Sequence, residues 1–318
     1  ARAAGEALGP LAGVPFTVKD GLDLAGHPTT YGITAFADNV APVDDPTIGR
    51  LRAAGAIPIG KTNQPEMAMR LATDNALFGL TRNPWHPDRT ASGSSGGEAS
   101  AIASGMAPMG VGTDLGGSVR NPAYACGIAA TKTSLGRLPV HGATPVAADP
   151  LLGRQWMAVA GPMARNVADL AAILRVTVGR HPRDPRTVDV PYDGGGFARR
   201  AAVPTDLPGG PIHPDAREAV RRAGEALAAA GWDVVDAAPP EMGRCYDLWG
   251  RLLGEDFPAT LTALDEVMTD DGTHLMRSSI EFWPAGEVAP QVVHAERLGL
   301  ARKWALFLDE FPVLVLPT

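Results

Sequence analysis

The sequence predicts an α/β fold in which helices cover a largely buried sheet. Patterns typical of a helix and then of a short apolar strand alternate along the chain. In two of these pairs a glycine separates the helix from the strand. The chain has 318 residues, of which 45% are hydrophobic and 20% charged, so it can bury a large core.

The first elements lie in the N-terminal half. Residues 47–54 predict a short helix that ends at Gly55, and residues 56–59 predict the strand that follows. Residues 99–105, rich in alanine and serine, predict a second helix, and residues 109–111 a second short strand.

The clearest helix lies in the C-terminal half, from Pro214 to Ala230, with the proline in its first turn. A strand over residues 232–235 is predicted to follow it. Residues 182–211 are rich in proline, glycine and charge and predict a long surface connection, whereas the apolar residues 313–318 predict a buried strand. The positions on the apolar helical face step by four and three residues: Ala216, Val220, Ala223, Leu227 and Ala230.

Composition excludes several classes of protein. The net charge of −7 argues against a protein that coats nucleic acid or anionic membranes. No apolar run approaches the ~18 residues that would span a membrane. Cys126 and Cys245 are too few and too far apart for a disulfide framework, which indicates free thiols in a reducing, cytoplasmic compartment. The seven histidines form no HxxxH or HExxH pair, so no metal site is expected.

A phosphate-binding loop is one alternative. The segment from Gly55 to Thr62 matches G-x-x-x-x-G-K-[ST] with Lys61 as its lysine, and residues 305–310 resemble the acidic magnesium strand of an ATPase. A phosphate loop needs free backbone N–H groups between a strand and a helix. Here Ala-Ile-Pro-Ile favours a strand and its proline has no N–H, so a P-loop ATPase is a minor alternative.

A nucleophile elbow is the second alternative. Residues 93–97 match G-x-S-x-G around Ser95, and Asp270 and His294 follow in the order that an α/β-hydrolase esterase requires. The preceding residues 83–90 are typical of a loop instead of the strand that the elbow needs, which weakens this interpretation.

A third set of residues is spread more widely. It comprises Val18-Lys19-Asp20, the glycine- and serine-rich run 92–97, and residues 112–120 around Ser118. Taken separately, a lone lysine is usually a surface charge, and a run of glycine and serine is usually a loop. Together they contain a hydroxyl nucleophile, an ionisable base and glycines that leave backbone donors accessible.

Residues 92–127 closely resemble the defining segment of the amidase signature family of serine hydrolases. The resemblance implies an α/β fold whose central mixed β-sheet is covered by helices on both faces. It further implies a single domain over residues 1–318 that lacks N-terminal and C-terminal portions of the full-length protein. Other segments that resemble the family are Gly60-Lys-Thr-Asn63 with Glu66, Lys132-Thr133 with Gly136-Arg137, Gly161-Pro-Met-Ala-Arg165 with Asp169-Leu170, and residues 313–318.

The resemblance implies a Ser–Ser–Lys triad. In it Lys19 is the base, Ser94 follows a cis peptide bond and relays the proton, and Ser118 is the nucleophile. A lysine with its ordinary pKa is almost wholly protonated at neutral pH, but burial beside neutral hydroxyls disfavours the ammonium form. We therefore expect activity to rise with pH as Lys19 loses its proton. No metal or organic cofactor is implied.

The resemblance and the glycine spacing also predict what surrounds the triad. Asp114 is expected to brace the loop that carries Ser118, and Arg120 to hold either a structural acid, which is the favoured role, or a substrate carboxylate. Donors for the oxyanion are expected from the backbone N–H groups of Leu115, Gly116, Gly117 and Ser118. The other residues expected near the triad or the substrate are Gly93, Ser95, Thr62, Asn63, Glu66 and Met67.

The activity that the resemblance implies is hydrolysis of a linear amide through a seryl acyl-enzyme, with esters and carbamates (urethanes) as further substrates. An ammonia-generating subunit like that of the tRNA-dependent amidotransferases is an alternative. Such subunits usually carry Arg-Tyr-Gly where this chain has Leu138-Pro-Val-His-Gly142, which favours a stand-alone amidase.

The sequence leaves the acyl group of the substrate open. Family members act on fatty, aryl, indolyl and small dicarboxylic amides, and Trp156, Phe282 and Trp283 are candidates for an aromatic acyl site. The expected partner is a small-molecule amide, with no nucleic acid and no membrane span. A homodimer is left open.

Overall fold

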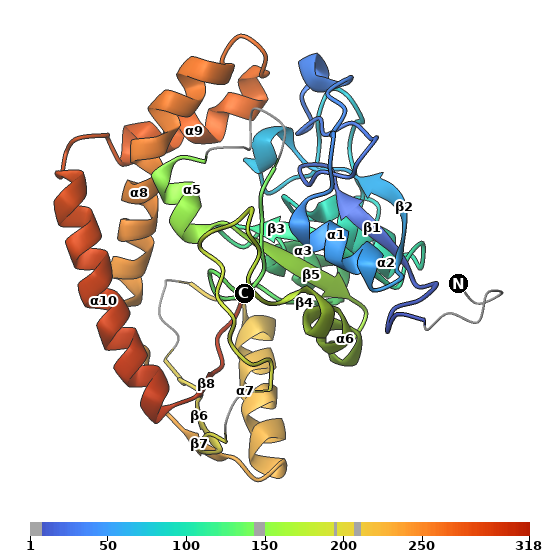
Figure 1. The fold of residues 1–318 in the computed structure, drawn as a ribbon. Coiled ribbons are helices and arrows are strands. Elements are labelled where there is room, and N and C mark those ends of the chain that lie inside the picture. Colours follow the sequence, from blue (N-terminus) through green and yellow to red (C-terminus); the bar gives the residue numbers. More distant parts are fainter. Residues whose placement is uncertain (1–7, 143–149, 194–195, 207–210) are drawn as a thin grey trace. The chain divides into compact units, whose positions relative to one another are not determined.

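The computed structural model describes residues 8–142, 150–193, 196–206 and 211–318 (Figure 1). They fall into two compact units. The first comprises Ala1–Tyr192 and Ala259–Ser278, and the second comprises Asp193–Pro258 and Ser279–Thr318. Two of the three boundaries fall inside helices, one in α8 (Met242–Leu264) and one in α9 (Asp270–Phe282). The single domain over residues 1–318 stays a prediction.

The first unit is built on a five-stranded sheet with the order β2-β1-β3-β5-β4. Strand β1 is parallel to both β2 and β3, while β5 is antiparallel to β3 and β4, so the sheet is mixed as predicted. The bounds of the strands are Pro15–Lys19 (β1), Ile57–Thr62 (β2), Met109–Asp114 (β3), Ala129–Ala130 (β4) and Val159–Ala164 (β5).

Helices cover both faces of this sheet (Figure 1). Apolar residues of α1 and α6 pack on one face in one core cluster, and those of α2 and α3 pack in a second cluster. The described helices that lie wholly within this unit are α1 (Pro46–Ala53), α2 (Gly96–Ala103), α3 (Arg120–Cys126), α5 (Leu152–Met157) and α6 (Val167–Thr177), with short 3-10 turns η2 (Thr34–Phe36) and η3 (Glu66–Ala68).

Strand β1 carries apolar side chains on one face of the sheet and polar side chains on the other, because successive side chains of a strand point to opposite faces. Phe16 and Val18 join the core cluster of α1 and α6. Thr17 and Lys19 point to the other face, where they contact Glu98 and Ser94 in and beside α2. All four side chains are buried, so the sheet carries an apolar core on one side and buried polar groups on the other.

Two glycines let α2 approach strand β3 closely. A Cβ atom at Gly110 would lie 1.4 Å from Glu98 Oε1, and one at Gly112 would lie 2.6 Å from Ser95 Oγ. No side chain fits at either position while α2 keeps its place. The glycines thus bring the start of α2 against the polar face of the sheet.

The second unit contains a parallel three-stranded sheet with the order β7-β6-β8. Its strands are β6 (Arg200–Ala202), β7 (Asp233–Val235) and β8 (Val313–Leu314). Helix α7 (Pro214–Ala229) and strand β7 confirm the predicted helix and strand, with His213 capping the helix.

Three predictions for the second unit need correction. Residues 305–310 belong to the long helix α10 (Pro290–Glu310) and form no acidic strand. Strand β6 lies inside the segment predicted as a surface connection, because its three residues, Arg-Ala-Ala, are too few to give a periodic signal. The strand expected over residues 313–318 comprises Val313–Leu314 alone.

Candidate active site

Lys19 is the last residue of β1 and its side chain is fully buried. Its Nζ lies 2.7 Å from Ser94 Oγ and 2.9 Å from Thr113 Oγ1, and a longer contact of 3.5 Å reaches the Thr113 carbonyl oxygen. The amine is therefore held from two sides, by the segment before α2 and by strand β3.

The surroundings of Lys19 favour its neutral form. Burial lowers the pKa of Lys19 from 10.5 to about 7, since a buried ammonium loses its hydration. The charges of Asp114, Glu98 and Asp20 act in the opposite direction, and Arg154 adds to the lowering. Near neutral pH a large fraction of this amine can accept a proton.

The segment that leads into α2 carries Ser94 and Ser95, and both side chains are buried. The peptide bond between Gly93 and Ser94 is cis. Gly93 has no room for a side chain, because a Cβ atom there would lie 2.4 Å from the carbonyl oxygen of Arg70. The backbone N–H of Ser95 donates to the carbonyl oxygen of Ser118 at 3.0 Å, which ties the two serine-bearing segments together.

Ser118 lies in the loop between β3 and α3, and its side chain is half-buried. Asp114 organises this loop, because its buried carboxylate accepts from the N–H groups of Gly117 at 2.9 Å and Val119 at 3.1 Å. The Arg120 guanidinium binds the same carboxylate in a bidentate pair, at 2.8 and 3.0 Å. Burial works to raise the pKa of Asp114, but Arg120 and the backbone donors outweigh it and hold this pKa below its usual range.

The loop N–H groups do not all point the same way. The Gly117 N–H, expected among the oxyanion donors, donates to Asp114. The N–H groups of Leu115, Gly116 and Ser118 donate to no acceptor among the described residues. Gly116 is exposed, so this part of the loop is open to a ligand.

The other residues expected near the triad hold the neighbouring loops. The Thr62 hydroxyl donates to Glu98, and the Asn63 side-chain amide donates to the carbonyl oxygen of Gly79 at 2.9 Å. The Met67 N–H donates to Tyr31, and Met67 has a positive φ of 49°.

Glu66 fastens the start of α9 to the η3 turn. Its carboxylate accepts from the backbone N–H and the hydroxyl of Thr269, at 3.0 and 2.8 Å. A Cβ atom at Gly272 would lie 1.8 Å from Glu66 Oε2, so this contact also depends on a glycine. Glu66 therefore supports the fold around the site.

Sequence reasoning missed two groups at the site. Thr113 contacts the amine of Lys19, and Glu98 is buried in α2 as the only acid of that helix. An acid among the small residues 96–103 is a usable signal, because a buried carboxylate needs partners. Nothing local marks Thr113, whose role depends on the pairing of β3 with β1.

The structure contradicts both minor alternatives. Lys61 lies in strand β2, where its Nζ donates to the carbonyl oxygen of Leu22, so no phosphate loop forms there. Ser95 is fully buried, and no strand lies between Asn63 and Ser95 in this part of the described chain. An elbow nucleophile needs both exposure and a preceding strand.

The candidate aromatic residues divide between the two units. Trp156 lies in α5 of the first unit with 42% of its surface exposed. Trp283 is buried in the second unit, where it packs edge-on against Phe282 and Tyr246. The proposed joint acyl site of Trp156, Phe282 and Trp283 stays a prediction.

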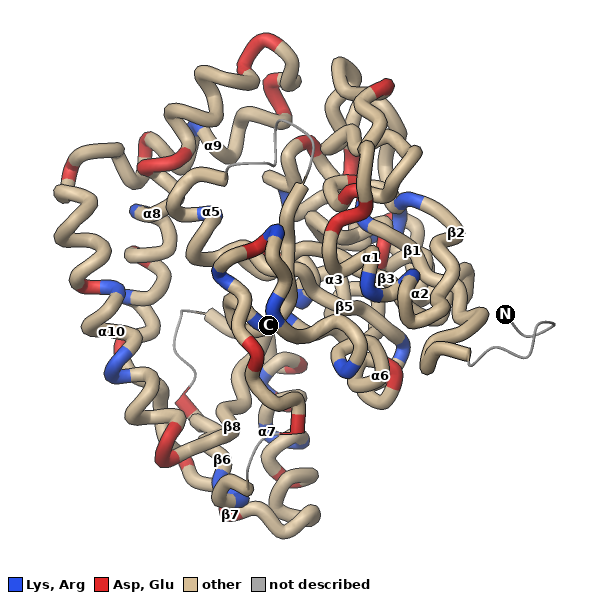
Figure 2. The backbone as a smooth tube through the Cα atoms, viewed as in Figure 1, with Lys and Arg blue, Asp and Glu red and all other residues tan. Residues whose placement is uncertain are grey.

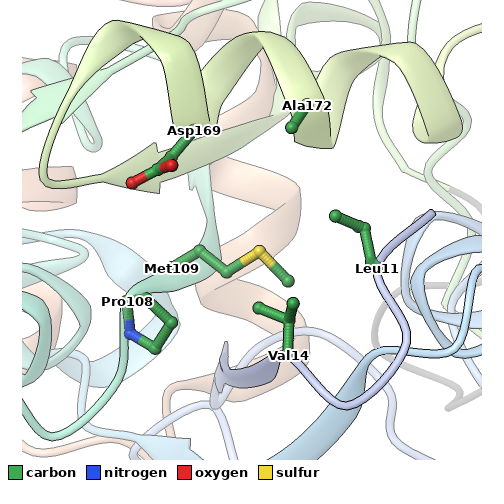
Figure 3. Close-up of a pocket in the computed structure, with 6 residues that line it drawn as sticks. All are labelled: Leu11, Val14, Pro108, Met109, Asp169 and Ala172. Atoms are coloured by element: carbon green, nitrogen blue, oxygen red, sulfur yellow. The ribbon is translucent and has the colours of Figure 1, made fainter.

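A small pocket of about 100 Å³ lies between α6 and the beginning of β3 (Figure 3). It is lined by Met109 at the beginning of β3, with Asp169 and Ala172 on α6. Asp114 ends the same strand, five residues later, so a strand rise of ~3.3 Å per residue separates the pocket from the triad end of β3 by roughly 16 Å. The pocket is thus not the candidate active site.

Three other kinds of site are a charged surface, a membrane-spanning helix and a metal site. Lysine, arginine and acidic positions are interspersed along the described chain (Figure 2). None of the described helices is long and apolar enough to cross a membrane. Among residues 8–142, 150–193, 196–206 and 211–318, no group of three or more His, Cys, Asp or Glu side chains could hold a metal ion.

Comparison with known proteins agrees with the resemblance seen in the sequence. The family model described as Amidase matches residues 1–305. Indoleacetamide hydrolase of Bradyrhizobium diazoefficiens is 36% identical over 330 aligned positions, which cover 100% of this chain and 61% of the relative. A glutamyl-tRNA(Gln) amidotransferase subunit of Acidothermus cellulolyticus is 34% identical over 310 positions, covering 93% of this chain and 60% of the relative.

A solved structure agrees with the fold. The structure of 6-aminohexanoate cyclic dimer hydrolase with its substrate superposes with a TM-score of 0.77 at 28% identity. The match covers 98% of this chain and 68% of that chain. The present chain thus spans less than two thirds of the length of the two relatives above.

Proposed function

This chain belongs to the amidase signature family, and from that premise we propose that it is part of an amidase that hydrolyses the C–N bond of linear amides. The observation that carries the proposal is the contact of 2.7 Å between the fully buried Lys19 amine and Ser94. A buried amine between hydroxyls suits a proton acceptor, because burial weakens its hold on a proton.

In the structure the Lys19 amine donates to Ser94 Oγ and to the two oxygens of Thr113. When Lys19 is neutral, two N–H bonds suffice for the oxygens of Thr113, and the nitrogen lone pair is then available to accept the hydroxyl proton of Ser94. Ser94 in turn takes the proton of Ser118 as Ser118 Oγ attacks the substrate carbonyl carbon. A C–O bond forms, and the carbonyl electron pair moves onto the oxygen.

The resulting oxyanion needs donors aimed at it. The N–H groups of Leu115, Gly116 and Ser118 are the donors that we assign, since the Gly117 N–H is engaged by Asp114. When the C–N bond breaks, the proton returns from Lys19 through Ser94 to the leaving nitrogen. Water then hydrolyses the seryl ester by the same route.

The substrate class follows from the relatives only as a proposal. We propose a small-molecule amide, with indoleacetamide as the first candidate because an indoleacetamide hydrolase matches along the whole chain. Carbamates and esters remain predicted substrates, since the same nucleophile and donors serve them. A cytoplasmic location, a homodimer and further N-terminal and C-terminal portions likewise stay predictions.

A second candidate is an ammonia-generating subunit, which the relationship to a glutamyl-tRNA(Gln) amidotransferase favours. Such a protein would release ammonia from glutamine in preference to an aromatic amide. Ammonia release from glutamine and from indoleacetamide, measured side by side, distinguishes the two candidates.

The triad is tested by labelling with a fluorophosphonate and mapping the adduct by peptide mass spectrometry. We expect an adduct on Ser118 that disappears in Lys19→Ala. An adduct on Ser95 would revive the esterase alternative. A folded protein without any adduct would overturn the serine-hydrolase proposal.

A further inference from the structure

Glu98 is a buried carboxyl group for which the proposed chemistry has no role. It is the third residue of α2 and its side chain is fully buried. The Thr17 hydroxyl donates to one carboxyl oxygen, and the Thr62 hydroxyl donates to the other at 2.5 Å. Gly110 leaves the space that the carboxyl occupies, since a Cβ atom there would overlap Oε1. The site for this group is therefore built by three strands.

The same three strands place Glu98 beside Lys19. Thr17 precedes Lys19 by two residues and shares its face of β1. Thr62 is the partner of Lys19 in the parallel pairing of β1 with β2. Ser94, which contacts the Lys19 amine, lies four residues before Glu98 at the start of α2. The carboxyl group and the amine thus face the same buried layer.

We propose that Glu98 is a positioning residue for the base, and that its charge determines how tightly Lys19 holds its proton. This inference rests on the proposed role of Lys19. Glu98 touches neither the nucleophile nor the substrate in this scheme, because its two carboxyl oxygens are occupied by Thr17 and Thr62.

The two groups change charge in the same pH range. Burial raises the pKa of Glu98 to about 7, against the lowering effect of the two hydroxyls and of Lys19. Burial lowers the pKa of Lys19 to about 7 as well. As pH rises, an ionised Glu98 favours the ammonium form of Lys19 and delays the appearance of the neutral base.

Other charges also act on Lys19. Asp114 raises its pKa, yet Arg120 and the backbone donors keep Asp114 ionised well below neutral pH. Asp20 adds a smaller effect in the same direction, and Arg154 opposes it. Of Glu98 and Asp114, Glu98 is the carboxyl whose charge changes while Lys19 titrates.

The test follows the rate of Ser118 labelling by a fluorophosphonate from pH 5.5 to 9, because this rate needs a neutral Lys19 but no knowledge of the substrate. In Glu98→Gln we expect the acid limb to move to lower pH by roughly half a unit to one unit, which from a midpoint of about 7 gives roughly two- to fivefold faster labelling at pH 6. The plateau at high pH is expected to stay within a few-fold. A purely structural role would lower the rate at every pH and leave the midpoint in place.

Glu66→Gln is the matched control, since Glu66 is an equally buried carboxyl with a hydroxyl partner and is not among the charges that act on Lys19. Its midpoint should equal that of the unmodified protein. Thr17→Val removes one donor to Glu98 without removing the carboxyl, so we expect a smaller shift in the same direction. If Glu98→Gln fails to fold, the midpoint of Thr17→Val tests the role of Glu98 in its place.

The outcomes separate the two proposals. Absence of labelling on Ser118 in the unmodified protein would overturn the proposed function itself. Normal labelling with an unmoved midpoint in Glu98→Gln, or in Thr17→Val where the first variant is unfolded, would overturn the role of Glu98 alone.

Discussion

The two faces of the central sheet in the first unit are equally buried but differ in chemistry. On one face, Phe16 and Val18 of β1 pack with Ile48 of α1 and Ile173 of α6 in an apolar cluster. On the other face the same strand presents Thr17 and Lys19 to hydroxyl and carboxyl groups.

Within the five residues of β1, the side chains on one face stabilise the fold and those on the other face belong to the candidate active site. Burial of apolar surface contributes about 25 cal/mol per Å², so the apolar face stabilises the fold. A buried amine or carboxyl costs free energy unless it is paired, and its proton affinity shifts instead. Changes on the two faces should therefore move different observables.

The largest expected effect is on the polar face. We expect Lys19→Met to lower the labelling rate of Ser118 by at least about 10³-fold, because the proposed base is lost. The free energy of unfolding should not fall, since an apolar side chain of similar length replaces a buried amine. Stopped-time labelling and urea unfolding measure the two quantities. A rate within tenfold of the unmodified protein would contradict the assignment.

The reverse behaviour is expected on the apolar face. Ile48 in α1 is fully buried, and Ile48→Ala should lower the free energy of unfolding by about 2–5 kcal/mol. Labelling of the folded fraction should be unchanged. Ile59→Ala is the control, because Ile59 in β2 is 52% exposed and its loss should change stability by about 0.5 kcal/mol or less. Equal losses in the two variants would show that the apolar cluster is not the stabilising face.

A glycine comparison tests the close approach of α2 to the sheet. Gly110→Ala places a methyl group on the Glu98 carboxyl and should destabilise the protein by about 1–3 kcal/mol. Gly60→Ala in β2 meets nothing within 4 Å and should be neutral within about 0.5 kcal/mol. Thermal unfolding of both variants measures the difference, and a neutral Gly110→Ala would mean that α2 does not press on β3.

The smallest effect is the pH dependence of the unmodified protein. Because the pKa of Lys19 is lowered to about 7, its neutral fraction grows with pH and levels off above that value. Labelling should therefore be about tenfold slower at pH 6 than on the plateau. A bell-shaped profile centred near pH 6.5 would point to a histidine base instead.

The elements that the sequence predicted well are those with a local pattern. The helix over 214–230 has a long apolar face, a proline in its first turn and a glycine after its end, and the structure places α7 within one residue of it. The predicted strand over 56–59 was too short, because β2 runs on to Thr62 through Gly60 and Lys61, which carry no strand signal. Strand β6 and helices α8, α9 and α10 were not anticipated.

The candidate site divides in the same way. Lys19, Ser94 and Ser118 were predicted as the triad from a family resemblance, on segments whose residue types suit acyl transfer. The use of the Gly117 N–H by Asp114 was not, since it depends on how the loop after β3 folds back on its own carboxylate. Glu98 was overlooked because a single acid in a helix is usually exposed to solvent.

The sequence by itself determined the alternation of helix and strand, the polar and apolar alternation along β1, and the residue types available for acyl transfer. These properties are encoded within a few neighbouring residues, where periodicity and turn preferences act. Only the tertiary structure decided that Lys19 is wholly buried and that Ser94, Thr113 and Glu98 surround it. A proton affinity is set by desolvation and by charges brought together from distant positions, and no local pattern records either.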